Sequence, residues 1–258
     1  MKLFWYFLVL VLFAGCGQSP VPPKPVDISR RADTITAQDT LVKQDSIHAV
    51  VSKDSLDTLS LQLLKAGLVD VQSLDSGIRV DLRYSTTDNF LGIDVYGDFN
   101  RCFLQADVAE KLVHAQRILR KKYPYYNLVV YDAVRPLHIQ RMMWDTLKLP
   151  PGEKQKYLSN PANGSLHNYG AAVDLSIIND SGFELDMGTP FDFFGEMAHP
   201  QRENALLEEG KLSRRQVANR EILRGVMREA GFFNIQTEWW HFNSCRREEA
   251  KLKYALVE

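Results

Sequence analysis

Two short segments, far apart in the chain, carry the residue types that most constrain its fold. Residues 165–174 place His167 and Asp174 seven positions apart, with small residues among those between them. Glu238 and His241 stand three positions apart near the C-terminus. Two imidazole nitrogens and one carboxylate oxygen form a set of three ligands that suits Zn²⁺ and leaves the fourth position open, as in catalytic zinc sites. The fold must then bring the two segments together. Glu238 is not one of the three ligands, so its carboxylate is free to act as a base.

Each of these residues also has a simpler explanation. A histidine in a loop is commonly held by hydrogen bonds alone, which is the alternative for His167. Asp174 lies within the apolar residues 171–178, where a carboxylate costs free energy unless it is paired, protonated or bound to a metal. Positions three apart on an ideal strand point to opposite faces. Glu238 and His241 can therefore reach one site only if the strand is broken or bulged between them.

A third segment offers chemistry for binding an anion. A predicted buried strand over residues 128–131 ends next to Asp132 and Arg135, and Pro136 follows at the start of a predicted helix. The guanidinium group of an arginine presents a planar fork of donors that suits an oxyanion or a carboxylate. The alternative is a structural ion pair between Asp132 and Arg135.

The first sixteen residues differ in composition from the rest of the chain. Lys2 precedes a run of apolar residues, 3–13, that is shorter than the ~20 residues needed to span a membrane. Small residues then stand directly before Cys16, a pattern that resembles the lipidation site of bacterial lipoproteins. We therefore expect a signal peptide over residues 1–16 and a lipid on Cys16. The protein would be anchored to a membrane of the cell envelope and face the periplasm; ordinary signal cleavage is the alternative.

The remainder of the chain divides into two parts. Residues 17–65 predict a flexible tether, because four prolines are followed by a polar stretch without a sustained apolar stripe, although residues 56–64 have the composition of a short helix. Residues 66–258 suffice for one catalytic domain, since domains commonly run to about 100–200 residues. Cys102 and Cys245 either form a disulfide or remain buried thiols. The formal net charge of -1 gives no electrostatic reason to expect nucleic acid as a partner.

The apolar pattern predicts a mixture of strands and helices without a regular βαβ repeat. This favours an α+β domain with a mainly antiparallel central sheet flanked by helices. Alternation at period two predicts strands at residues 68–74 and 78–84, as a hairpin or as neighbours. The further elements predicted by periodicity, caps and β-branching are helices at 106–122, 136–147 and 214–230 and strands at 128–131, 171–178 and 237–243.

Five motifs follow one another over residues 68 to 245 in a characteristic order. They are Asp81-Leu82-Arg83-Tyr84 with Asn89-Phe90, Tyr131-Asp132-Ala133-Val134-Arg135-Pro136, Ser165-x-His167-x-x-Gly170-x-Ala172-x-Asp174, Met187-Gly188-Thr189-Pro190-Phe191-Asp192 and Glu238-Trp239-Trp240-His241. Together they resemble the D-alanyl-D-alanine dipeptidase family, the VanX type of zinc DD-peptidases. The resemblance implies a hedgehog/DD-peptidase-like fold.

The resemblance also implies a role for each matching residue. His167, Asp174 and His241 would hold one zinc ion per chain. Glu238 would take a proton from the attacking water and later protonate the leaving amine. Arg135 would stabilise the oxyanion that develops on the peptide carbonyl.

Further matching residues would contact the substrate. Asp192 would bind the free ammonium group of a dipeptide, and Ser165 and Asp132 would position the substrate or the catalytic arginine. The implied reaction is zinc-dependent hydrolysis of D-Ala-D-Ala or a related D,D-dipeptide in the turnover of peptidoglycan precursors. Two alternatives stay open. One is a D,D- or L,D-carboxypeptidase that trims peptidoglycan stem peptides, and the other is a non-catalytic wall-binding lipoprotein on the same fold.

Overall fold

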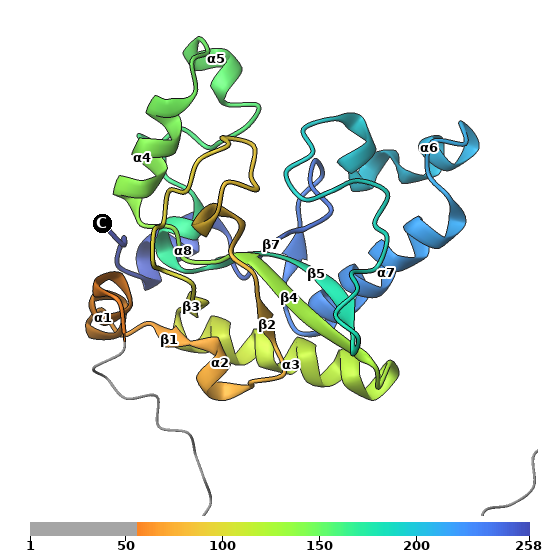
Figure 1. The fold of residues 1–258 in the computed structure, drawn as a ribbon, viewed down its shortest axis with the longest axis horizontal. Helices are drawn as coiled ribbons and strands as arrows, with labels where there is room; N and C mark the ends of the chain where they lie inside the picture. Colours follow the sequence, from red (N-terminus) through yellow and green to blue (C-terminus); the bar gives the residue numbers. More distant parts are fainter. Residues whose placement is uncertain (1–55) are drawn as a thin grey trace, which may run out of the picture. The chain divides into compact units, whose positions relative to one another are not determined.

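A five-stranded sheet lies at the centre of the computed structural model, which describes residues 56–258 (Figure 1). Its strand order is β2-β4-β5-β7-β6. β2 and β4 run parallel, and the other three neighbouring pairs are antiparallel. The predicted α+β class with a mainly antiparallel sheet is therefore confirmed. The strands are β1 (Val69–Asp70), β2 (Arg79–Val80), β3 (Phe103–Leu104), β4 (Tyr126–Asp132), β5 (Ala172–Asn179), β6 (Phe233–Asn234) and β7 (His241–Asn243).

Helices flank this sheet, and the longest of them, α3, packs against both β4 and α7 (Figure 1). The α-helices are α1 (Thr58–Lys65), α2 (Val71–Leu74), α3 (Ala106–Lys122), α4 (Leu137–Thr146), α5 (Pro151–Lys154), α6 (Glu203–Glu208), α7 (Arg214–Glu229) and α8 (Arg247–Lys253). Short 3₁₀ helices lie at η2 (Arg83–Ser85), η3 (Leu166–Tyr169), η4 (Glu196–Ala198) and η5 (Pro200–Arg202). The helices predicted for residues 106–122, 136–147 and 214–230 are all present.

The apolar stripe of α3 forms part of the core. Val108, Leu112, Ala115 and Leu119 recur at spacings of three and four, and each is fully buried. Burying one such leucine contributes about 1.5–3 kcal/mol, so the stripe fixes which face of α3 meets the sheet. The exposed face of α3 carries charged side chains such as Glu110 and Arg117.

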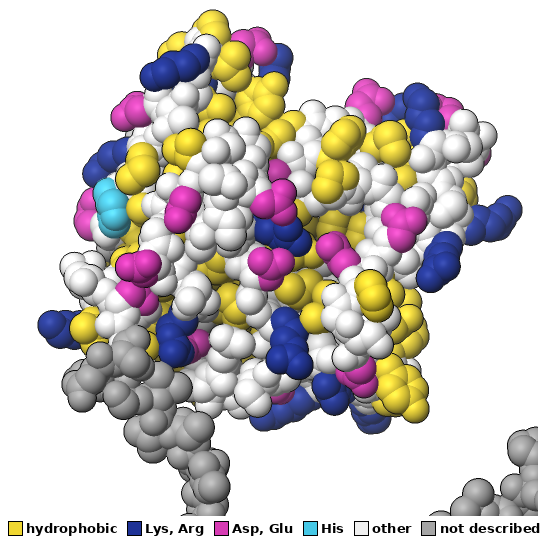
Figure 2. Space-filling view, viewed as in Figure 1, with side chains coloured by type: hydrophobic (Ala, Val, Ile, Leu, Met, Phe, Trp, Pro, Cys, Tyr) yellow, Lys and Arg dark blue, Asp and Glu magenta, His cyan; other side chains and the backbone are white. Residues whose placement is uncertain are grey.

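The surface of the molecule carries charges of both signs. On the face drawn in Figure 2, acidic and basic side chains are interspersed, in keeping with the net charge of -1.

The caps of α7 follow from the residues at its ends. The hydroxyl of Ser213 accepts a hydrogen bond from the backbone N–H of Gln216, whose side chain in turn accepts one from the backbone N–H of Ser213. Gly231 lies just past the C-terminus with φ of 89°, a conformation that glycine adopts at little cost. Both ends of this helix were readable from the sequence.

The two strands predicted near the start of the domain are largely wrong. Only Val69–Asp70 and Arg79–Val80 are extended, and they do not pair with each other. β1 pairs with β3, and β2 pairs in parallel with β4. The carboxylate of Asp70 accepts a hydrogen bond from the N–H of Gln72 at 3.1 Å and so begins helix α2. Short polar–apolar alternation did not distinguish a strand from a capped single turn of helix.

Helix α1 lies within the stretch assigned to the tether. Asp57 caps it by accepting a hydrogen bond from the N–H of Ser60 at 2.9 Å, and Leu63 is buried in the core. The packed part of the chain thus extends N-terminal to residue 66. The signal peptide, Cys16 and the tether up to residue 55 lie outside the described residues. Within residues 56–258, none of the helices has the length and apolar character needed to cross a membrane.

The two cysteines of the domain are not joined. Cys102 and Cys245 are both free and buried, which supports the buried-thiol alternative over a disulfide. Burial raises the pKa of both thiols above the ordinary value. Each side chain belongs to an apolar cluster of buried residues and packs there as a small apolar group.

Candidate active site

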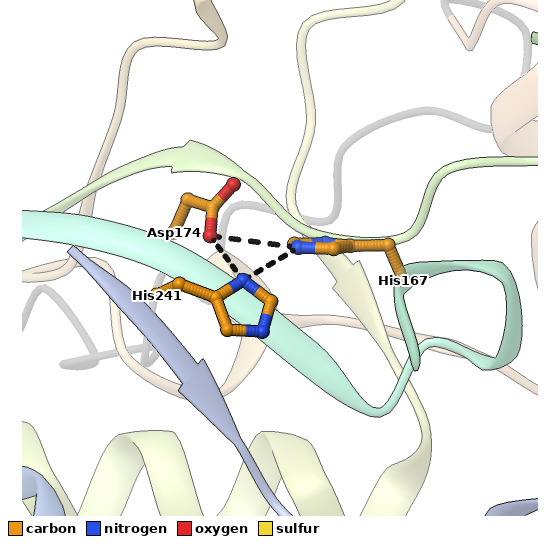
Figure 3. Close-up of side chains that lie close together, drawn as sticks. All are labelled: His167, Asp174 and His241. Carbon is orange, nitrogen blue, oxygen red and sulfur yellow. Dashed lines mark hydrogen bonds and ion pairs between the residues drawn. The ribbon is translucent and has the colours of Figure 1, made fainter. Parts of the chain in front are cut away.

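His167, Asp174 and His241 meet at one point of the structure (Figure 3). Nε2 of His167 lies 3.2 Å from Nδ1 of His241, which lies 2.8 Å from Oδ1 of Asp174. The third side of the triangle, from Nε2 of His167 to Oδ1 of Asp174, is 3.5 Å. Ligand atoms bound at about 2.0–2.2 Å to one tetrahedral zinc ion lie about 3.3 Å apart. The triangle therefore has the size of a zinc site.

Local structure places each corner of this triangle. Asp174 and His241 are direct partners in the antiparallel pairing of β5 and β7. His167 comes from η3, which begins where the hydroxyl of Ser165 accepts a hydrogen bond from the N–H of His167 at 3.2 Å. Gly170 ends η3 with φ of 61° and turns the chain into β5. The residues between His167 and Asp174 thus form the end of η3, one turn and the first residues of β5.

Hydrogen bonds fix which ring nitrogen of each histidine faces the triangle. Nδ1 of His167 donates to the carbonyl of Ala133 at 2.7 Å, and Nε2 of His241 donates to Oδ1 of Asn243 at 2.9 Å. The other nitrogen of each ring faces Asp174, and it can bind a cation once it gives up its proton. Such partners on the outer nitrogen are the usual way in which metal-binding histidines are oriented. The donor set fits a divalent cation.

The electrostatics at this point also favour a positive charge. Burial alone would lower the pKa of His241, but the hydrogen bond and the charge of Asp174 raise it to about 9. Burial alone would raise the pKa of Asp174, but His167 and His241 hold it well below the ordinary value. In both cases the negative charge of Asp174 and a positive charge at the triangle stabilise each other.

Glu238 lies beside the triangle because the predicted strand is shorter than expected. β7 begins at His241, and the backbone of residues 236–240 is irregular, with bends at 236–237 and 239–240, so it does not extend the strand from 237. The side-chain amide of Asn234 donates to the backbone carbonyl of Glu238 at 2.8 Å and holds this bend. Glu238 and His241 therefore line the same cavity, which two positions three apart on a straight strand would not do. Burial raises the pKa of Glu238 above its ordinary value.

Arg135 enters the same cavity, and Asp132 lies behind it. Nε of Arg135 donates to Oδ2 of Asp132 at 3.0 Å, while the hydroxyl of Tyr96 donates to Oδ1 of the same carboxylate at 2.8 Å. Burial would lower the pKa of Arg135, but the carboxylate of Asp132 raises it, so the guanidinium stays charged. The predicted ion pair and the predicted anion-binding arginine are therefore one arrangement, in which Asp132 orients Arg135.

Asp192 is held in the cavity by Tyr84, a residue without a predicted role. The hydroxyl of Tyr84 donates to Oδ2 of Asp192 at 2.8 Å. Asp192 has φ of 59° and is the one non-glycine residue with positive φ among residues 56–258. Backbone of this kind is maintained only where the surroundings impose it and is concentrated at functional sites. Burial raises the pKa of Asp192 well above the ordinary range.

The cavity that these side chains share has a volume of about 240 Å³. Ser165 lines it, together with aromatic residues and a second arginine, Arg247. Every predicted site residue of the domain thus lines the cavity, except Asp132, which lies behind Arg135. The residues that sequence reasoning missed are Tyr84, Asn243, Arg247 and the Tyr96 that holds Asp132. Tyr84 lies within a quoted motif, but the others carried no signal in the sequence.

Comparison with known proteins shows the family to which the domain is similar. The family model described as D-ala-D-ala dipeptidase matches residues 64–255. D-alanyl-D-alanine dipeptidase from Escherichia coli (strain K12) is 32% identical over 175 residues, which cover 68% of this chain and 83% of that protein. The protein of the same name from Enterococcus faecium is 29% identical over 194 residues, with 69% and 92% covered.

One solved structure, the LD-carboxypeptidase LdcB, resembles the chain weakly. Its TM-score is 0.36 at 19% sequence identity, and the alignment covers 58% of this chain and 63% of that one. A likeness at this level carries no argument about fold or function. The family model and the two dipeptidases establish the family, because the matches span most of the domain and most of each relative. The chain belongs to the D-alanyl-D-alanine dipeptidase family.

Proposed function

We propose that this chain hydrolyses the peptide bond of D-Ala-D-Ala or a related D,D-dipeptide, with one zinc ion held by His167, Asp174 and His241. The observation that carries the proposal is the triangle of three ligand atoms, 2.8 to 3.5 Å apart, in a cavity that also holds Glu238 and Arg135. The relatives named D-alanyl-D-alanine dipeptidase support the same reaction.

The residues around the triangle supply the remaining chemistry. Zinc, when bound, polarises a peptide carbonyl and makes water nucleophilic near neutral pH. Glu238 takes the proton of the attacking water and passes it to the leaving amine. Arg135 offers N–H donors to the oxygen on which negative charge develops. Because Asp132 and Tyr96 already hold Arg135 in place, little reorganisation is needed during the reaction.

The cavity favours a dipeptide over a longer peptide. Its volume of about 240 Å³ is below the roughly 300–1,000 Å³ of sites that hold drug-sized ligands. Asp192 places a carboxylate in the wall, which suits a free ammonium group. In a stem peptide, an uncharged amide would occupy that position. These two features argue against the carboxypeptidase alternative, and the complete set of catalytic side chains argues against a purely wall-binding protein.

We also propose that the protein is a lipoprotein anchored through Cys16 to a membrane of the cell envelope. The support is the sequence alone: the short apolar run, the small residues before Cys16 and the polar stretch that follows. In this arrangement the catalytic domain faces the periplasm, and its substrates are D,D-dipeptides of peptidoglycan precursor turnover.

The test is an activity panel on the purified protein. It comprises D,D-, L,D- and L,L-dipeptides and a muropeptide that carries a stem peptide, each with and without a chelator. We expect turnover of D-Ala-D-Ala that is lost with the chelator and restored by Zn²⁺, with about one zinc per chain. Turnover of the muropeptide alone would reject the dipeptidase in favour of the carboxypeptidase. Full activity in protein free of metal would reject the metal site.

A further inference from the structure

Two arginines line the cavity, and only one of them is paired. Arg135 is bound to Asp132, as described above. Arg247 also lines the cavity, yet within residues 56–258 its guanidinium has no acidic side chain at ion-pair distance and makes no hydrogen bond. It is neither fully buried nor fully exposed. Arg247 is thus a positive charge available to a ligand.

The fold brings Arg247 to the cavity on a different element from the other charged groups. It is the first residue of α8, which packs on η3 through a small apolar cluster that contains Ala250, Leu166 and Tyr169. Asp192 comes instead from the loop before η4 and is held by Tyr84. The cavity therefore presents one acidic and one basic group from two separate parts of the chain, in addition to the triangle and its catalytic residues.

A dipeptide carries one positive and one negative end, and both must lose water to enter a small cavity. The proposed function assigns Asp192 to the ammonium end and Arg135, which is paired with Asp132, to the scissile carbonyl. On the basis of the function proposed above, we propose that Arg247 binds the C-terminal carboxylate of the substrate. The planar fork of a guanidinium matches the two oxygens of a carboxylate, and such charge-assisted pairs are stronger than neutral hydrogen bonds. Arg247 then selects peptides with a free C-terminus.

The preceding residue provides a matched control. Arg246 carries the same charge, is exposed and does not line the cavity. Loss of either arginine changes the net charge equally, so a difference between the two variants reports the contact and not the long-range field. Arg247→Lys keeps the charge but loses the fork of donors.

The experiment compares D-Ala-D-Ala with its C-terminal amide in the wild type, Arg247→Ala, Arg247→Lys and Arg246→Ala. We expect Arg247→Ala to raise KM for the free acid by about 10- to 100-fold while kcat changes less than about threefold. The amide should be a poor substrate for the wild type and no poorer for Arg247→Ala. Arg247→Lys should recover part of the preference for the acid, and Arg246→Ala should match the wild type.

The outcomes separate this proposal from the one on which it rests. If the wild type hydrolyses D-Ala-D-Ala but Arg247→Ala keeps the wild-type ratio of kcat/KM for acid over amide, the assignment of Arg247 is wrong and the dipeptidase function stands. If the wild type hydrolyses neither compound, the dipeptidase function is wrong and the assignment falls with it. Zinc content and circular dichroism establish that each variant is folded. If Arg247→Ala does not fold, the ratio of kcat/KM for acid over amide in Arg247→Lys tests the assignment instead, and a wild-type ratio there would contradict it.

Discussion

Glu238 differs from the other carboxylates of the cavity in its hydrogen bonds. Asp174 accepts one from His241 and Asp192 accepts one from Tyr84, whereas the Glu238 carboxylate accepts none within the described residues. The absence of a fixed partner is compatible with the proton transfer proposed for Glu238. Its raised pKa moves it toward the operating pH, where a general base works best.

Replacement of Glu238 tests this role. Glu238→Gln keeps the shape of the side chain but removes its ability to accept a proton. We expect kcat for D-Ala-D-Ala to fall by about 10²- to 10⁴-fold. Zinc content, measured by mass spectrometry, should stay at the wild-type level, because Glu238 is not a corner of the triangle. A variant with full hydrolysis would remove Glu238 from the mechanism.

Asp192 predicts a dependence of substrate affinity on pH. Burial raises its pKa, and only the ionised form binds an ammonium group well. As the pH falls through the raised pKa, Asp192 takes up a proton and affinity is lost. We therefore expect KM for D-Ala-D-Ala to rise on the acid side of a series from about pH 8 to 5, at higher pH than an ordinary carboxylate would cause. Asp192→Asn should have a high KM that varies little over the same range.

At the level of elements, the turn from η3 into β5 matters most, because it sets His167 relative to Asp174. Gly170 holds this turn with φ of 61°. A Cβ on Gly170 would lie 3.0 Å from Cδ2 of Leu68 and 3.3 Å from the backbone nitrogen of Gln105. The turn is therefore closed to larger residues by its neighbours as well as by its backbone conformation.

Gly170→Ala should therefore disturb both stability and metal binding. The left-handed conformation costs a residue with a Cβ roughly 1–2 kcal/mol, and the close contacts add to this. Gly182 is the matched control, since its φ is 81° and nothing lies within 4 Å of an added Cβ. We expect thermal unfolding to shift down in both variants, with a loss of zinc affinity in Gly170→Ala alone. Equal zinc affinity in the two would show that the turn does not position His167.

At the level of the whole molecule, the proposed anchor and the catalytic domain should be separable. The core described for residues 56–258 is built from those residues, and Cys16 lies outside them. We expect Cys16→Ser to move the protein from the membrane fraction to the soluble fraction without a change in kcat/KM on D-Ala-D-Ala. Cys245→Ser, which removes a buried thiol of the domain, should stay with the membrane. A wild-type distribution for Cys16→Ser would contradict lipidation.

The sequence predicted the elements whose signals are local. The stripe of α3, the caps of α7 and the β-branched run of β4 are each encoded within a few neighbouring residues, because helix and strand periodicity and end caps are short-range effects. It also held the motifs that resemble the dipeptidase family, and with them the three corners of the triangle. Period-two alternation at residues 68–84 failed, because the partners of β1 and β2 lie elsewhere in the chain.

Residue order by itself therefore determined the family, the longer helices and strands, and the side chains able to hold a metal. Only the tertiary structure decided how they meet. Contacts between distant segments pair Asp174 with His241 across β5 and β7 and form the bend that places Glu238 beside them. They also place Asn243, Tyr84 and Arg247 at the site. Such contacts are set by packing and by the register of the sheet, which leave no periodic trace in the sequence.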